Sequence, residues 1–380
     1  MLSPSLIKLA WFTLATVLSC TLIPSAAAQT SDAQTNEAQT WTKTAESHTA
    51  NMNPTRTTES HHQSAKGTVD NQTVERLGAE GRYEPYYDIE RESVQVNGTT
   101  VRTIERTFTR DASGQKILTR VTEEEKQSLP SGGEKMVRTI SNADLNGQLQ
   151  VAQREVTNTK KISPEVQEKN TTIFLSDGQG GMAASMQIQQ REKRSTDHTV
   201  EVQTSTLLPD GSGNWQVHER KEGTIKEEGK ERTTEEQVLR TDIDGKLAPV
   251  SHTIGKESET AVGEKKNTVE TYSPDLSGSA VDGNLHLSQR VMLVKRAGAG
   301  GAQATEKRLE QINPEDPGAG LQVTTKTLDT AQPGASGTRE TSTIEARDIS
   351  GSFTVVSFDT QKSDNVHAVD VEIAPQNKTK

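Results

Sequence analysis

The chain has 380 residues, of which 30% are hydrophobic and 3% aromatic, and its formal net charge is −10. A thick, multilayered enzyme is hard to build from this material, because globular domains draw on about 45–50% apolar residues, Gly included, and aromatic side chains bury much of the area in a core. Acidic charge interspersed along the chain also argues against a nucleic-acid partner. The sequence therefore predicts no enzymatic activity.

The first 28 residues have the pattern of a signal peptide. Lys8 supplies the positive charge, residues 9–23 form the apolar stretch, and an A-x-A cleavage pattern ends at Ala28, immediately before Gln29. The apolar stretch is short and heterogeneous for a membrane span. We therefore expect export and cleavage between Ala28 and Gln29.

Lipidation at Cys20 is the alternative processing event. The residues Val17-Leu18-Ser19 before Cys20 resemble a bacterial lipobox, in which the cysteine becomes the lipidated first residue. Cys20 is also the only cysteine, so a chain cut after Ala28 contains no disulfide. The predicted location is the periplasm, the cell surface or the medium, with anchoring through Cys20 as the alternative.

Residues 29–72 are rich in Thr, Ser, Gln and Asn and contain few aliphatic side chains. Such a segment has little apolar surface to offset the entropy of ordering, so we predict a disordered leader. The neighbouring His61 and His62 lie in it, and we interpret them as polar filler, not as a metal site.

Residues 73–373 form a repeat array. Glycines recur in steps of 31 to 38 residues, mostly 33, which is the range of repeat architectures. Each follows an Asp-x-x-Gly turn or a variant of it, and apolar residues tend to lie two and four positions later, as Leu149 and Val151 do after Gly147. Asp caps its own backbone and Gly supplies a positive φ. The turn glycines are Gly81, Gly114, Gly147, Gly180, Gly213, Gly245, Gly283, Gly320 and Gly351.

Each repeat is predicted to be a hairpin. Alternation of apolar and polar residues indicates strands with one wet face, and a second set of breakers lies midway between the glycines. The fold class is all-β: an elongated antiparallel β-meander of about nine hairpin repeats of ~33 residues. The last predicted strand is 366–373, followed by a tail at 374–380.

The repeat resembles one found in secreted bacterial proteins of unknown function, built from tandem D-x-x-G-x-L-x-x-x-x-R units. The likeness covers roughly residues 78–373, and it implies a repeat-built, exported, non-enzymatic protein without assigned functional residues. A weaker likeness is to YD repeats, but Arg110, Ala143 and Ser176 stand where those have Tyr. The matching residues are Asp144, Gly147, Leu149 and Arg154, and later Asp210, Gly213, Trp215 and Arg220.

We interpret the candidate metal-binding and catalytic sites in the array as structural features. The loops at 177–181 and 210–213 are similar to calcium-binding loops, but they lack the nine-residue period, and the twelfth position counted from Asp242 is Thr253. The histidines of the array lie in different units, without a nucleophile motif. We therefore predict no catalytic, cofactor-binding or metal-binding residue and no cofactor.

Two further interpretations concern surfaces. An outer-membrane barrel is rejected, because such barrels carry a lipid-facing apolar band and aromatic girdles, and this chain has few aromatics. Tyr83, Tyr86 and Tyr87 are expected to cap the start of the array, with a sugar-stacking patch as the alternative.

The predicted function is a structural or interaction role in the periplasm or at the cell surface. The alternative is an adhesin or carbohydrate-binding module that uses the long sheet face. Expected partners are a protein or a polysaccharide, with no nucleic acid, no integral membrane span, and self-association through the apolar stripe.

Export gives the first test. N-terminal sequencing of the mature protein should find Gln29 as the first residue, because the small-residue site after the apolar stretch ends at Ala28. A mature chain that begins at a lipid-modified Cys20 would replace this prediction with the anchored form.

Overall fold

The computed structural model describes most of the chain after residue 39. The segments 1–39 and 364–380 lie outside it, and with them Cys20, Ala28, Gln29 and the predicted strand 366–373. The chain divides into two units, Met1–Glu37 and Ala38–Lys380, and only the second contains described residues. The described residues are 40–47, 53–65, 67–111, 113–260, 263–274, 285–313, 317–334, 337–348 and 350–363.

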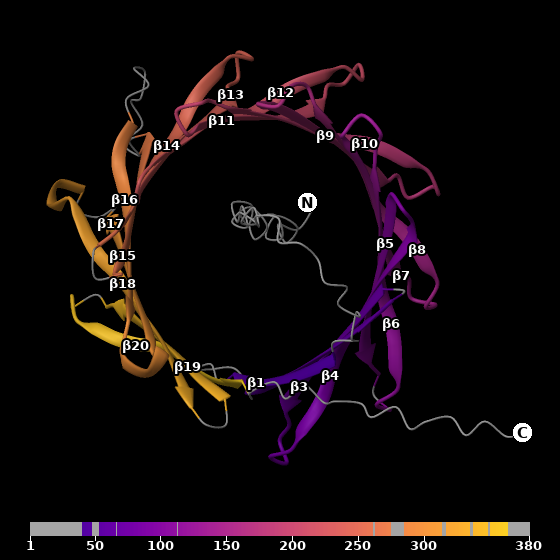
Figure 1. The fold of residues 1–380 in the computed structure, drawn as a ribbon, viewed down its shortest axis with the longest axis horizontal. Coiled ribbons are helices and arrows are strands. Elements are labelled where there is room, and N and C mark those ends of the chain that lie inside the picture. The colour runs from indigo at the N-terminus through magenta and orange to yellow at the C-terminus, as the bar shows by residue number, and fades with distance from the viewer. Residues whose placement is uncertain are drawn as a thin grey trace, which may run out of the picture. The chain divides into compact units, whose positions relative to one another are not determined.

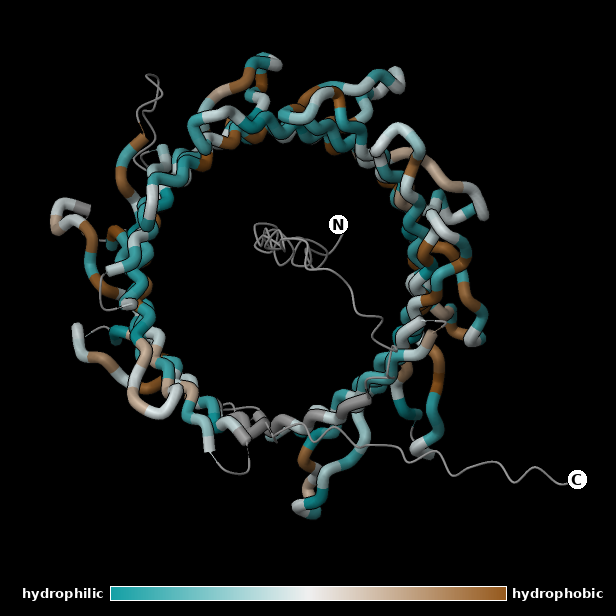
Figure 2. The backbone as a smooth tube through the Cα atoms, viewed as in Figure 1, coloured by the Kyte–Doolittle hydropathy of each residue, from teal (hydrophilic) through white to brown (hydrophobic). Residues whose placement is uncertain are grey.

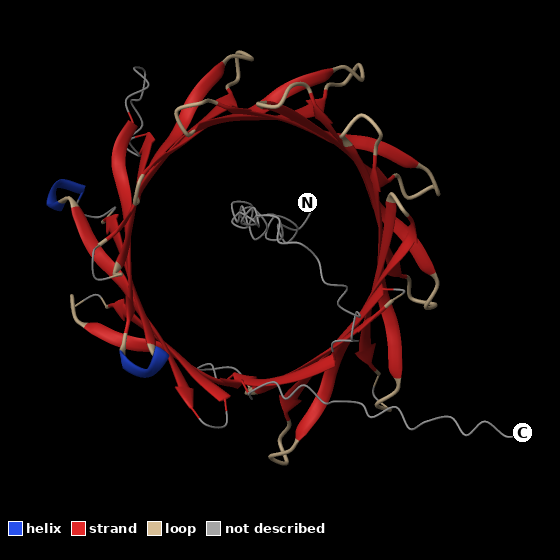
Figure 3. Cartoon of the chain, in the orientation of Figure 1, coloured by secondary structure: helices blue, strands red, loops and turns tan. Residues whose placement is uncertain are grey.

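These residues form one sheet of 20 strands and two single-turn 3-10 helices (Figure 3). The helices are η1 (Ala299–Gly301) and η2 (Pro317–Ala319). Of the residues described, no helix is long and apolar enough to cross a membrane. The strands are β1 (Thr40–Ser47), β2 (Thr55–Ser64), β3 (Gly67–Leu77), β4 (Tyr83–Asn97), β5 (Thr100–Arg110), β6 (Lys116–Ser128), β7 (Glu134–Ala143), β8 (Leu149–Lys161), β9 (Val166–Ser176), β10 (Met182–Arg194), β11 (Thr199–Pro209), β12 (Trp215–Glu228), β13 (Glu231–Thr241), β14 (Leu247–Glu259), β15 (Lys265–Pro274), β16 (Leu285–Ala297), β17 (Gln303–Ile312), β18 (Leu321–Gly334), β19 (Gly337–Arg347) and β20 (Phe353–Ser363).

Each strand pairs antiparallel with the next strand in the chain, from β1–β2 through to β19–β20. The prediction of an all-β antiparallel meander is therefore confirmed. The sheet is not extended, however: it curves into a ring in which β20 lies beside β1, with Cα atoms within 8 Å (Figure 1). Among the described pairings, no ladder joins these two strands.

Regularly placed β-bulges provide a physical reason for the curvature. The strand after each tight turn contains one extra residue, usually five positions after the turn glycine, where the register shifts. A bulge bends its strand and increases the local twist. Where the extra residue is a serine or threonine, its hydroxyl donates to a carbonyl of the neighbouring strand: Thr119 to Thr107, Ser185 to Ile173, Ser288 to Thr271 and Thr324 to Leu309, at 3.1–3.3 Å.

The sheet has little apolar core. The buried hydrophobic residues are Val74, Val121, Ile140 and Leu207, and no described side chain is less than 2% exposed. The buried polar residues are as numerous: Asp88, Thr100, Thr122 and Thr157. Backbone ladders and cross-strand side-chain pairs must therefore supply much of the cohesion of this single layer.

The predicted disordered leader is partly wrong, because β1, β2 and the start of β3 lie within residues 29–72. Polar cross-strand pairs stabilise these strands, so a lack of aliphatic residues does not indicate disorder here. Arg56 Nε lies 2.6 Å from Glu75 Oε2, and His61 Nδ1 lies 2.5 Å from Asp70 Oδ1. Because successive side chains on β2 alternate between faces, His61 and His62 do not point to a common site.

Hydroxyl pairing gives a test of this cohesion. Thr157 is 4% exposed, and its Oγ1 lies 2.8 Å from Oγ1 of Thr171 on the facing strand. Thr157→Val should lower the free energy of unfolding by about 1–2 kcal/mol, since it leaves the Thr171 hydroxyl without its partner. The double variant Thr157→Val/Thr171→Val should recover most of the loss in urea titrations. Equal additive losses would show that the two hydroxyls do not act as a pair.

Candidate functional site

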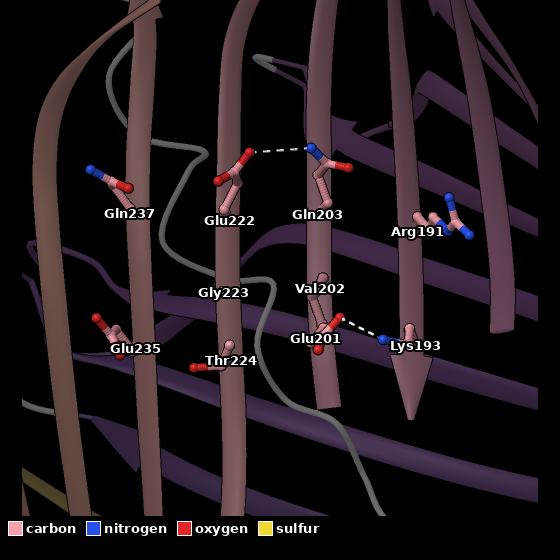
Figure 4. Close-up of a pocket in the computed structure, with 10 residues that line it drawn as sticks. All are labelled: Arg191, Lys193, Glu201, Val202, Gln203, Glu222, Gly223, Thr224, Glu235 and Gln237. Atoms are coloured by element: carbon pink, nitrogen blue, oxygen red, sulfur yellow. Dashed lines mark hydrogen bonds and ion pairs between the residues drawn. The ribbon is translucent and has the colours of Figure 1, made fainter. Parts of the chain in front are cut away.

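The strands β10 to β13 form a shallow polar depression of about 500 Å³ on the wall of the ring (Figure 4). Strand register assembles it from residues that are far apart in the chain. Gln203 of β11 faces Arg191 of β10 and Glu222 of β12, and Glu222 faces Gln237 of β13. The lining residues are Arg191, Lys193, Glu201, Val202, Gln203, Glu222, Gly223, Thr224, Glu235 and Gln237.

Two rows of side chains cross the depression. One row is Arg191, Gln203, Glu222 and Gln237, and the other, two residues along each strand, is Lys193, Glu201, Thr224 and Glu235. Because side chains two residues apart share a face, all eight lie on one side of the sheet, which we call the glutamate face. Gly223 and Val202 belong to the opposite face, and Gly223 contributes only backbone.

Charge is divided across the depression. The two cations, Arg191 and Lys193, come from β10, whereas the three carboxylates come from β11, β12 and β13. Lys193 Nζ lies 3.2 Å from Glu201 Oε2, and Gln203 Nε2 donates to Glu222 Oε1 at 3.2 Å. Within the described part of the chain, Arg191 has no hydrogen-bond or ion-pair partner, so its guanidinium is available to a ligand.

Hydrogen bonds, ion pairs and one ring contact continue along the glutamate face beyond the depression. His252 Nε2 on β14 lies 2.8 Å from Glu235 Oε1, and the ring of His252 lies 5.9 Å from that of Tyr272. The Tyr272 hydroxyl donates to Glu270 at 3.1 Å, and Arg290 then joins Glu270 to Glu310, at 2.9 and 3.2 Å. Polar contacts thus run across five strands, β13 to β17.

The opposite face carries charge at the same level. Lys221, which pairs with Val238, lies there, and so does Glu236, which pairs with Gly223 on one side and Thr253 on the other. Neither face presents an unbroken apolar band at this height. Both faces therefore suit contact with water or polar solutes better than contact with hydrocarbon.

The aspartates of the tight turns accept hydrogen bonds from the backbone amides of their own turns. In the turn that ends at Gly147, Asp144 Oδ1 accepts from the amides of Asn146 and Gln148, at 2.8 and 2.9 Å, and Gly147 adopts a φ of 76°. The aspartates at 111, 177, 210, 242 and 348 bond their own turns in the same way. Among the described residues, no group of three or more His, Cys, Asp or Glu could hold a metal ion.

These hydrogen bonds lower the pKa of several turn carboxylates. For Asp144 the largest cause is the amide of Gln148, and for Asp111, Asp210 and Asp348 it is the hydroxyl of the serine two residues later. A lowered folded pKa means that the carboxylate stabilises the fold above its unfolded pKa, and that this contribution is lost as the pH falls through the folded value. These four turns are therefore built around ionised aspartate.

The tyrosines predicted to cap the array lie on β4, near its first described tight turn. Tyr86 and Tyr87 make an edge-to-face pair with centroids 5.5 Å apart, and the guanidinium carbons of Arg56 and Arg76 lie 4.7 and 5.0 Å from the ring centres of Tyr83 and Tyr86. Strands β1 to β3 precede them, so they do not mark the start of the sheet. Sequence reasoning missed the depression itself, because register alone brings its residues together.

Searches against protein-family models and against curated proteins find no match. Several solved structures are similar in strand architecture. The copper transporter OprC is 7% identical, with 87% of this chain and 81% of that chain covered and a TM-score of 0.43. The FrpB iron transporter from Neisseria meningitidis is 9% identical, with 86% and 74% covered and a TM-score of 0.42. OccK5 (OpdH) from Pseudomonas aeruginosa is 10% identical, with 86% and 97% covered and a TM-score of 0.46.

These findings correct several predictions. The similar structures are transporters and porins, including a BenF-like porin, and not periplasmic scaffolds, adhesins or carbohydrate-binding modules. These similar structures run against the predicted structural or interaction role, its adhesin alternative and the expectation of no integral membrane span. At these identities and TM-scores, no residue role is taken from the similar proteins.

The turn design leads to a paired test. Gly147→Val should lower the free energy of unfolding by about 1–3 kcal/mol, because a β-branched residue is strained at positive φ. Gly98→Val is the matched control: Gly98 lies in a turn without positive φ, and an added Cβ would meet nothing within 4 Å. Urea titrations compare the two variants. EDTA should leave both curves unchanged, and a calcium-reversible loss of stability would refute the metal-free turn.

Proposed function

We propose that the ring of strands is the wall of a polar passage and that the protein has a transport or channel role at the outer membrane. The observation that carries the proposal is the ring itself, a next-neighbour antiparallel meander of 20 strands whose first and last strands lie side by side (Figure 1). In this proposal the nine or so repeats predicted from the sequence are the hairpin units that make up the wall.

Strand number supports a passage. At ~4.8 Å between strands and a tilt of about 40°, a ring of this size has a circumference of about 125 Å and a diameter of about 40 Å between backbones. Barrels of eight strands are filled by their own side chains, whereas those of 16 to 18 strands leave an aqueous channel. Side chains from opposite walls of this ring are too short to meet.

The polar wall supports a hydrophilic solute. Charged and amide side chains line the depression on the glutamate face, and Lys221 and Glu236 lie on the opposite face, so that whichever face lines the passage offers polar groups. A lysine turned toward lipid near the midplane of a bilayer costs about 2–4 kcal/mol, and a glutamate less. In our proposal, therefore, this level of the wall lies outside the hydrocarbon of the bilayer. No catalytic activity forms part of it.

Conductance tests the proposal. The purified chain added to planar bilayers should produce ion conductance, and Glu235→Lys or Glu236→Lys should change the cation-to-anion selectivity. These neighbours lie on opposite faces of β13, so each is the matched control of the other, and the variant that shifts selectivity identifies the lining face. Absence of conductance, together with absence of the chain from outer-membrane fractions, would refute the transport role.

A further inference from the structure

Exposed apolar side chains gather at one end of the ring. The described tight turns lie along one edge of the sheet, because the hairpins repeat the same order of tight turn and looser turn. Figure 2 shows hydrophobic segments along the hairpins that project from the ring. Most of the large exposed hydrophobic side chains belong to these turns or to strand residues near them: Tyr86, Ile117, Leu145, Leu149, Val151, Leu175, Ile243, Val355 and Val356.

Two of these residues have no structural reason to be apolar. Leu145 and Ile243 occupy the same position, directly after the aspartate of the turn, and their relative exposures are 106% and 101%. They bury no surface in the described fold, so they contribute nothing to its core. Apolar surface repeated at one edge of a protein marks a site of interaction.

The turns are also suited to leaving bulk water. In the turn at 144–148, Asp144 N donates to the carbonyl of Gln148 at 2.9 Å, and Gly147 N to the carbonyl of Asp144 at 3.0 Å. The amides of Asn146 and Gln148 are satisfied by the Asp144 carboxylate. Most backbone donors of the turn are thus paired internally, which lowers the cost of placing it in a medium poor in water.

We propose that the tight-turn edge of the ring docks on the surface of a zwitterionic phospholipid bilayer, with Leu145 and Ile243 inserted among the lipids at the headgroup boundary. The apolar residues lie on separate hairpins around a ring, and a flat, deformable surface can receive all of them at once. Interfacial segments bind membranes in this way, with apolar side chains reaching a few ångströms into the boundary.

Charge complementarity favours this occupant over a second copy of the chain. Asp144 and Asp242 begin the turns of Leu145 and Ile243, and aspartates also begin the turns at 111, 177, 210 and 348, so two rings meeting at this edge would bring carboxylates together. The ammonium groups of choline headgroups complement the same carboxylates. Anionic lipid would repel them, so the proposal predicts weaker binding to vesicles that also contain phosphatidylglycerol.

Vesicle partitioning tests the proposal. The purified full chain should bind phosphatidylcholine vesicles in flotation or titration assays, and Leu145→Ser and Ile243→Ser should each weaken partitioning by about tenfold. Val96→Ser and Ile162→Ser are the matched controls, since Val96 and Ile162 are exposed by 58% and 57% at the looser turns of the other edge. These controls should bind as the unmodified chain does.

Three results would overturn the docking surface: unchanged partitioning of the turn variants, an equal loss in the controls, or a dimer that the turn variants abolish while vesicle binding stays intact. Circular dichroism melts verify that all four variants fold. Docking does not depend on the proposed passage, because vesicle binding without conductance supports the surface while refuting the channel.

Discussion

The backbone ladder between neighbouring strands is the interaction on which the structure depends. Only four hydrophobic residues are buried among the described positions, and they are scattered over β3, β6, β7 and β11. Within the described part of the chain, no second layer covers either face, so each strand is stabilised mainly by the strands beside it. Thr–Thr contacts and ion pairs, such as Arg91–Glu105 and Arg240–Glu219, add to the ladder along its length.

This dependence explains what could be predicted from the sequence. The turn at Gly147 and the alternation of Leu149 and Val151 are local signals, and local signals suffice for a meander of hairpins. The strand β2 gives no such signal, because Thr, Ser, His and Gln dominate it and its order comes from partners on β1 and β3. A prediction of disorder from a low content of apolar residues therefore fails for strands whose ladders are stabilised by polar side chains.

The curvature of the sheet and the candidate site could not be predicted from the sequence, for a different reason. The bulge positions hold residues as unlike as Tyr86, Ala152 and His218, because a bulge is a property of backbone pairing and not of one side-chain type. The depression likewise depends on register across four strands. Arg191 and Glu222 are separated by two turns in the chain, and only the pairing of both with Gln203 places them on one surface.

The recurring bulge also makes the diameter of the ring depend on the number of repeat units in the chain. Each unit contributes two strands, or about 12 Å of circumference at the usual spacing and tilt, and it contacts only its neighbours. Duplication or loss of one internal unit would widen or narrow the ring without altering the register of any other pair. A gene that gains and loses such units can therefore adjust the diameter of its product in regular steps, while the chemistry of every remaining hairpin is retained.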